Sequence, residues 1–370
     1  MDSWKPFIID KTFTKFQSKA AMLIINPKSV VKFPKLIGKT NERYRQMIID
    51  ELKEKITGKN VRIVFTEGWD KRVMGAAVAL KKDNVLEPVL LGEVEDVQKC
   101  AKDNGFDIEG IEIVSPSTYP RMDEMAVKMV SLRKGKLDEQ AAKEALTKTN
   151  YFGTMLVVMG EADGLLGGAT YSTADTVRPA LQLVKTKPGH SLVSSCFMLV
   201  KDDHQYFMGD CAINRDPNPD ELVEIAMQTA DTAQKFGVDP KVAMLSYSSY
   251  GSATGHCVAK MNEATVRLQR MPLDYAVDGE MQFDCAVSPE VAKLKAPDSP
   301  VAGHANTFIF PNLSSGNIGY KIAARLGGYE AIGPVLQGLN APINDLSRGA
   351  NEDEIYKMAI VTAAQKYLGI

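Results

Sequence analysis

The sequence predicts an α/β protein with two α/β domains and mainly parallel sheets, and three observations support this. Short apolar runs of strand length alternate with longer amphipathic segments, the order expected when helices connect parallel strands. The chain has 370 residues, more than one ordinary hydrophobic core contains. Its composition, with 45% hydrophobic and 24% charged residues, is that of a globular protein without repeats or low-complexity segments.

The expected helices begin at residue 41. They cover 41–57, 69–82, 94–104 and 121–134. The second of them places Val73, Ala76, Ala77 and Leu80 on one face, which is the spacing of an amphipathic helix.

Apolar runs between these segments are interpreted as buried strands. They lie at 61–65, 88–92, 155–159, 192–200, 241–247 and 307–310. Ligands of parallel sheets bind beyond the carboxyl ends of the strands. We therefore expect the functional residues in the loops that follow strands.

Charge and composition exclude several classes of function. The formal net charge of −2 argues against a nucleic-acid-binding protein, which usually has a basic excess. Five widely spaced cysteines without a C-x-x-C pair, and no signal-like apolar stretch near the start, favour free thiols in the cytoplasm. The four histidines show no metal-ligand spacing, so we expect no metal site, and no apolar run is long enough to span a bilayer.

Residues 1–50 differ from the rest of the chain. Lysines outnumber acidic residues there, and helical periodicity is weak before Asn41. The segment lacks the arginines of a transit peptide before Arg43 and contains Asp2 and Asp10. We interpret it as an N-terminal extension that packs against the body of the protein or a partner subunit.

The most informative stretch spans residues 344–355, with the sequence NDLSRGANEDEI. Here Ser347, Arg348 and Gly349 lie where a loop turns into a helix. Glycine permits a close backbone approach, and the free N–H groups of a first helical turn attract anions. Arg348 adds a fixed fork of donors suited to phosphate, so the stretch predicts an anion site. Asn344, at its start, is a further candidate for substrate binding.

Nucleotide-binding signatures are missing elsewhere. Residues 251–255 have the sequence GSATG, which lacks the Gly-Lys-Ser/Thr ending of a P-loop. No G-x-G-x-x-G follows a predicted strand, which argues against a kinase or a simple dinucleotide dehydrogenase. A decarboxylating dehydrogenase of similar architecture would need an aspartate cluster for metal, and none is found.

The chain resembles the phosphate acetyltransferase (phosphotransacetylase) family from about residue 58 to its C-terminus. The resemblance rests on the Ser347-Arg348-Gly349 signature and on four further blocks. These are STADTVRPALQ at 172–182, APDSPVAG at 296–303, SSGNIGYK at 314–321 and GPVLQGL at 333–339.

The resemblance implies reversible transfer of an acetyl group between acetyl phosphate and coenzyme A (CoA), with release of inorganic phosphate. It implies an active site in a cleft between two α/β domains, a homodimer, and no metal or redox cofactor, since CoA is a substrate. It also implies a discontinuous domain I at 51–188 and 333–370, and a domain II at 189–332.

Site residues follow from matching positions. Arg178 matches an arginine of the family's phosphate site, although it is also placed to pair on the surface with Asp175. Arg133 matches the family's other functional arginine, although its Lys-Gly-Lys neighbourhood is typical of a solvated helix end. Ser347 is expected to position the thiol or the acyl oxygen, and Arg348 to hold phosphate or CoA.

The predicted base departs from the family, which has an aspartate seven residues after the signature serine. Glu354 occupies that position, with Asp353 before it as an alternative. A thiol has an unperturbed pKa of about 8.5 and is mostly protonated at neutral pH, so a base is required to form the thiolate. However, Asn351 and Glu354 also fit a capping box, in which the glutamate bonds the N–H of the cap residue.

Three further departures are Ala350 for a cysteine, Tyr171 for a histidine and Tyr250 for a lysine. They leave two alternatives open: transfer of a propionyl or butyryl group, or a catalytically weakened relative that binds CoA or phosphate.

Overall fold

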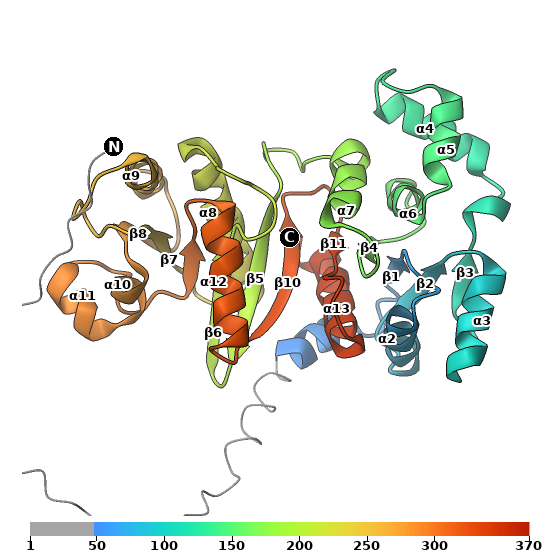
Figure 1. Cartoon of the computed structure of the whole chain (residues 1–370), viewed down its shortest axis with the longest axis horizontal. Helices are drawn as coiled ribbons and strands as arrows, with labels where there is room; N and C mark the ends of the chain where they lie inside the picture. Colours follow the sequence, from blue (N-terminus) through green and yellow to red (C-terminus); the bar gives the residue numbers. More distant parts are fainter. Residues whose placement is uncertain (1–47, 370) are drawn as a thin grey trace, which may run out of the picture. The chain divides into compact units, whose positions relative to one another are not determined.

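The computed structural model describes residues 48–369, and Figure 1 shows its helices and strands. The predicted extension therefore lies outside the described residues except for its last three positions. Residues 48–56 are helical and contribute Ile48, Ile49, Leu52 and Ile56 to the core, in agreement with the predicted helix over 41–57 where it is described.

The first sheet has five parallel strands in the order β11-β4-β1-β2-β3. Their bounds are β1 (Arg62–Phe65), β2 (Glu87–Leu91), β3 (Glu112–Val114), β4 (Gly164–Gly167) and β11 (Ile343–Asp345). Alternation along β1 sends Ile63 and Phe65 to one face and Val64 to the other, because successive side chains of a strand point in opposite directions. Both faces are apolar, as expected for a parallel sheet covered on both sides.

Helices cover both faces of this sheet (Figure 1). On one side lie α2 (Lys71–Lys82), α3 (Val94–Asn104) and α13 (Glu352–Leu368), and on the other α4 (Met122–Leu132), α5 (Glu139–Leu146), α6 (Thr149–Val158) and α7 (Thr173–Pro179). A 3₁₀ turn, Pro116–Thr118, follows β3, and a π-helical turn, Ala180–Val184, extends α7.

The second sheet has six strands in the order β10-β5-β6-β9-β7-β8. They are β5 (Ser194–Lys201), β6 (His204–Gly209), β7 (Lys241–Leu245), β8 (Ala276–Met281), β9 (Thr307–Ile309) and β10 (Glu330–Gln337). Strand β5 is antiparallel to both of its neighbours, and the other pairs are parallel. The predicted α/β class with mainly parallel sheets is therefore confirmed.

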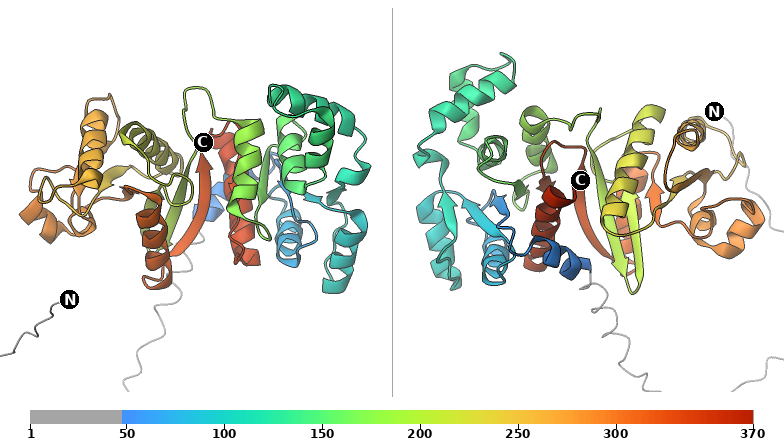
Figure 2. Two further views of the ribbon diagram at one scale, coloured as in Figure 1. Left: turned by 45° about the horizontal axis from the view of Figure 1, so that its top comes forward. Right: turned by 180° about the vertical axis from the view of Figure 1, so that it is seen from behind.

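Two groups of helices pack against the second sheet. Helices α8 (Pro219–Lys235) and α9 (His256–Gln269) share one apolar cluster, and α10 (Phe283–Val287), α11 (Pro289–Lys295) and α12 (Leu313–Arg325) pack with another. Helix α13 contacts both β4 and β10, so it joins the two sheets (Figures 1 and 2). The predicted domain boundary at 332/333 falls inside β10, and the domain division remains a prediction.

One predicted strand is wrong. Residues 155–158 form the end of α6, and the strand that follows is β4, whose sequence is GLLG. Helix α6 buries six of its ten residues, including Phe152, Met155 and Leu156. A helix buried on most sides is apolar all round, and a short apolar run in it cannot be distinguished from a strand by periodicity.

Candidate active site

A cavity of about 580 Å³ opens where the carboxyl end of β11 meets α12, α13 and β10. Its walls combine charged and aromatic side chains with apolar ones. They are Tyr171, Thr173, Phe197, Ala212, Asn317, Tyr320, Lys321, Ala324, Arg325, Tyr329–Pro334, Asp345–Ala350, Glu354, Lys357 and Met358. Three predicted site residues, Ser347, Arg348 and Glu354, lie together in this lining.

The loop between β11 and α13 carries the signature residues. A tight turn forms because the Ala350 N–H donates to the Ser347 carbonyl at 2.9 Å, while the Gly349 N–H donates to Ser347 Oγ at 3.3 Å. Ser347, Arg348 and Gly349 are exposed, whereas Ala350 is buried. The turn thus presents a hydroxyl and a guanidinium beside the N-terminus of a 17-residue helix.

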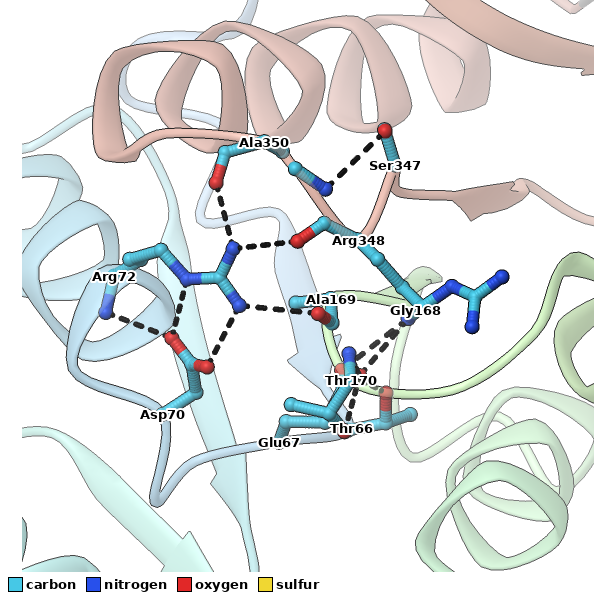
Figure 3. Close-up of polar contacts among 11 residues, drawn as sticks. Thr66, Glu67, Asp70, Arg72, Gly168, Ala169, Thr170, Ser347, Arg348 and Ala350 are labelled. Atoms are coloured by element: carbon cyan, nitrogen blue, oxygen red, sulfur yellow. Dashed lines mark hydrogen bonds and ion pairs between the residues drawn. The ribbon is translucent and has the colours of Figure 1, made fainter.

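Arg72 of α2 holds this loop through hydrogen bonds to its backbone carbonyls (Figure 3). Its Nη1 donates to the carbonyls of Arg348 (2.9 Å) and Ala350 (2.8 Å), and its Nη2 donates to the carbonyl of Ala169 (3.0 Å). Asp70 holds the guanidinium through a charged pair at 2.8 Å. Although burial opposes it, bonding from Arg72 keeps the pKa of Asp70 below its usual value.

Glu67 organises the loop after β4 in the same way (Figure 3). Its carboxylate accepts from the N–H groups of Gly168 (3.1 Å) and Thr170 (3.0 Å) and from the hydroxyl of Thr66 (2.8 Å). Burial raises the pKa of Glu67, against the effect of these bonds. Thr66 also bonds the hydroxyl of Tyr171 at 2.7 Å, which connects this buried network to the cavity wall.

Asp345, the last residue of β11, is a buried carboxyl group in the cavity lining. It accepts a hydrogen bond of 2.6 Å from the Thr176 hydroxyl, and the Thr173 hydroxyl also bonds it. Burial raises the pKa of Asp345 to about 6, against the two hydroxyls and the positive charge of Arg348. No sequence pattern singled out Asp345, although it lies two residues before the signature serine.

Three further cationic side chains line the cavity. Lys321 and Arg325 come from α12, and Lys357 comes from α13, where it pairs with Glu330 and Asp353 at 2.6 Å each. Lys321 and Arg325 are exposed to solvent. Together with Arg348 they make the cavity suitable for an anionic ligand.

Glu354 has the capping role that the sequence offered as an alternative. Its N–H donates to Asn351 Oδ1 at 2.9 Å, and its Oε2 accepts from the Asn351 N–H at 3.0 Å. The residue is exposed and still lines the cavity. Asp353, the alternative base, pairs with Lys357 and is not in the lining.

Asn344 does not have the position expected of a substrate-binding residue. It is fully buried, accepts from the Leu336 N–H at 2.8 Å, and donates to Thr362 (2.8 Å) and Gln365 (2.6 Å). These bonds join β10, β11 and α13. The structure thus gives Asn344 a structural role, and its contact with substrate stays a prediction.

The two other predicted arginines are not in the cavity lining. The Arg178 side chain is 57% exposed on α7, with its guanidinium 3.8 Å from the Asp175 carboxylate. Arg133 is the C-cap residue that follows α4. The structure thus brings Ser347, Arg348 and Glu354 together, and leaves Arg178 and Arg133 as predictions from the resemblance.

Departures from the family lie both inside and outside the cavity. Ala350 and Tyr171 line it, whereas Tyr250 follows β7 and donates to Asp278 at 2.7 Å.

In the described part of the chain, no group of three or more His, Cys, Asp or Glu side chains is arranged to hold a metal ion. None of the described helices is both long and apolar enough to cross a membrane.

Residues 47–363 match the phosphate acetyl/butaryl transferase family. The chain belongs to this family. It is 50% identical to a phosphate acetyltransferase of Staphylococcus epidermidis over 323 residues, which cover 86% of this chain and 98% of that protein. A phosphate acetyltransferase of Staphylococcus aureus is 51% identical over 322 residues, with the same coverage.

Solved structures of the family have the same fold. A phosphotransacetylase from Streptococcus pyogenes superposes with a TM-score of 0.84 at 52% identity, covering 87% of this chain and 98% of that one. The EutD phosphotransacetylase from Staphylococcus aureus gives 0.80 at 50% identity, with the same coverage. A branched-chain phosphotransacylase from Enterococcus faecalis, at 19% identity and a TM-score of 0.63, shares the fold.

Proposed function

We propose that this protein is a phosphate acetyltransferase that transfers an acetyl group reversibly between acetyl phosphate and CoA. The observation that carries the proposal is the Ser347–Ala350 turn, held by Arg72 over a cavity lined by cations and carboxyl groups. Family membership and relatives near 50% identity that are named phosphate acetyltransferase support it.

The phosphate of acetyl phosphate binds at the turn. Arg348 supplies a planar fork of donors, and the N-terminus of α13 lies beside it. Lys321 and Arg325 on the facing wall are placed to bind further phosphate groups of CoA. Holding both substrates in one cavity makes acyl transfer effectively intramolecular, and such positioning lowers a barrier by about 7–11 kcal/mol at best.

The thiol of CoA then attacks the acetyl carbonyl directly. A carboxylate of the cavity takes the thiol proton, and Glu354, the residue predicted from the sequence, lines the cavity for this task. Ser347 Oγ is placed to bond the thiol or the acyl oxygen. None of the five cysteines, all within the described residues, lines the cavity, which favours direct transfer over an acyl-cysteine intermediate.

A longer acyl group is the second candidate substrate. The family's description includes butyryl as well as acetyl transfer, and apolar side chains, among them Phe197, Ile332 and Met358, line part of the cavity. Pocket volume decides between such substrates by only about 1–3 kcal/mol per methylene.

We also propose that the protein is a homodimer in the cytoplasm. Within α12, all of whose residues are described, only Gly316 is buried, and Ile318 and Ile322 are 58% and 53% exposed. With Leu326 after the helix, they form an apolar stripe at four-residue spacing. A stripe of this kind can pack against its own copy across a two-fold axis. Free cysteines and a CoA substrate suit a reducing compartment.

The testing experiment measures thioester formation, by its absorbance, from purified protein and CoA with acetyl, propionyl or butyryl phosphate, without added metal. We expect the highest kcat/KM with acetyl phosphate. A higher value for butyryl phosphate would favour the second candidate. CoA binding without turnover of any of the three would favour a weakened relative.

A further inference from the structure

In the proposed reaction the leaving phosphate needs a proton, and the base that deprotonates the CoA thiol does not supply it. Attack of a thiolate on the acetyl phosphate dianion would expel phosphate with three negative charges, which is a much stronger base than the thiolate. A proton delivered to the leaving oxygen as the C–O bond breaks removes this cost. The cavity therefore needs a proton donor beside the phosphate site.

Asp345 has the position of such a donor. It ends β11 two residues before Ser347, is only 2% exposed, and lines the cavity. The Thr176 hydroxyl fixes its Oδ1 at 2.6 Å. Gly168 packs so closely that a Cβ there would collide with Oδ1, which holds the carboxyl in one place.

The surroundings of Asp345 stabilise its protonated form relative to that of an ordinary aspartate. Its pKa is raised to about 6 by burial, even with Arg348 nearby. Arg348 and Tyr171 interact electrostatically with Asp345, and the charged residues Glu354 and Lys357 of α13 line the same cavity. A phosphate dianion bound at Arg348 offsets that positive charge, so substrate binding should raise the pKa of Asp345 further.

We propose that Asp345 is a second catalytic carboxyl group, which donates its proton to the leaving phosphate. This inference rests on the proposed function. The sulfur–carbon bond forms as the thiol proton passes to Glu354. The bond between the acetyl carbon and the phosphate oxygen breaks as the Asp345 proton moves to that oxygen. Hydrogen phosphate leaves, and the two carboxyl groups recover their starting states by proton exchange with water in the open cavity.

Glu354 and Asp345 have different environments, as expected if one acts as the base and the other as the acid. Glu354 is exposed at the first turn of α13, whereas Asp345 is buried at the end of β11. Pairs of acidic residues in unlike surroundings commonly act as base and acid of one reaction. In the reverse reaction, the ionised Asp345 accepts the proton of hydrogen phosphate.

The test uses Asp345→Asn, which keeps the shape and removes the transferable proton. We expect kcat to fall by about 10²–10⁴, with the dissociation constant of inorganic phosphate unchanged within threefold. The wild-type rate should decline at alkaline pH as Asp345 ionises in the complex, and this decline should be missing in the variant. A kcat within threefold of wild type, or an equal loss of phosphate binding with an unchanged pH profile, would overturn the assignment.

A second variant keeps the test decisive if Asp345→Asn does not fold. Thr176→Val removes a hydrogen bond that favours the charged carboxylate, so the alkaline decline should move to higher pH. An unmoved decline would contradict the role of Asp345. The matched control is Asp163→Asn, a carboxylate at the amino end of β4, for which kinetics and pH profile should not change. A wild-type protein without turnover would instead defeat the proposed function itself.

Discussion

The guanidinium of Arg72 donates a hydrogen bond of 2.9 Å to the backbone carbonyl of Arg348, so one arginine holds the main chain of another in place. The same group also reaches the carbonyls of Ala350 and Ala169 and pairs with Asp70. The loops after β11 and β4 are therefore tied to α2 through a single side chain. Arg348 is thereby free to direct its own side chain into the cavity.

Replacing Arg72 should loosen the signature loop. Arg72→Lys keeps the charge beside Asp70 but cannot reach three carbonyls with one ammonium group. We expect unfolding to cost about 2–3 kcal/mol less and kcat to fall about 10- to 100-fold. Urea denaturation and thioester assays measure both. The control Arg62→Lys, at an exposed pair with Glu112, should change stability by less than about 0.5 kcal/mol. Equal effects of the two variants would contradict the role of Arg72.

The two roles of Glu354 can be separated. Glu354→Gln retains a capping box, because glutamine also bonds the N–H of the cap residue. Stability should therefore change by less than about 0.5 kcal/mol, while kcat falls about 10²–10⁴ through loss of the base. Glu352→Gln, in the same turn but outside the cavity lining, is the control and should keep its activity. Wild-type turnover in Glu354→Gln would leave capping as the only role.

Arg348 should contribute more to phosphate binding than Arg178. Arg348→Gln removes a charged donor from the cavity and should raise KM for acetyl phosphate about 10- to 100-fold. Arg178→Gln should have a smaller effect, because that side chain is 57% exposed beside Asp175 and does not line the cavity. Steady-state kinetics of the two variants measure KM for acetyl phosphate and decide between these roles. An equal rise in both variants would show that Arg178 reaches the substrate, as the family resemblance implies.

Asp345 should lower stability at the pH of activity. Its pKa is about 6 in the folded protein against an ordinary 3.8, so the folded state binds the proton more tightly. Stability from this group is complete below pH 3.8 and is lost as pH rises to about 6. Asp345→Asn should thus melt at an equal or higher temperature than wild type at pH 8. A lower melting temperature there would mean that the ionised carboxylate stabilises the fold.

The stripe on α12 should control self-association. Ile322→Glu places a charge in the middle of the stripe and should shift the protein toward the monomer in sedimentation equilibrium. Leu294→Glu on α11 provides the control, since Leu294 is 86% exposed and lies outside the stripe. A wild-type monomer, or a dimer unaffected by Ile322→Glu, would show that this face does not join two copies.

Local patterns predicted much of the fold because their physical cause is local. The helix predicted over 69–82 is α2, and the apolar runs at 61–65 and 307–310 are β1 and β9. The run at 155–159 was misassigned because burial of α6 comes from contacts with distant segments. Strand β4, with its sequence GLLG, gives no strand signal of its own. There Gly167 leaves room for Thr66 and Tyr171, a reason visible only in three dimensions.

Some residues of the candidate site could be predicted from the sequence, and others could be found only in the structure. The anion site at Ser347 and Arg348 was predicted from consecutive residues where a loop turns into a helix, whereas the role of Glu354 as base came from the family resemblance. Arg72 supports the same loop from 276 residues away along the chain, so no spacing could indicate it. Asp345 was overlooked although it lies two residues before the signature serine, because its position is held by Thr176 and Gly168 from other elements.

The proposed reaction transfers an acyl group between a thiol and phosphate. The most direct test incubates the purified protein with acetyl-CoA and inorganic phosphate and traps acyl phosphate with hydroxylamine. We expect acetyl phosphate in amounts equal to the CoA released, and its loss in Arg348→Ala. Release of CoA with free acetate alone, or no release, would contradict this reaction.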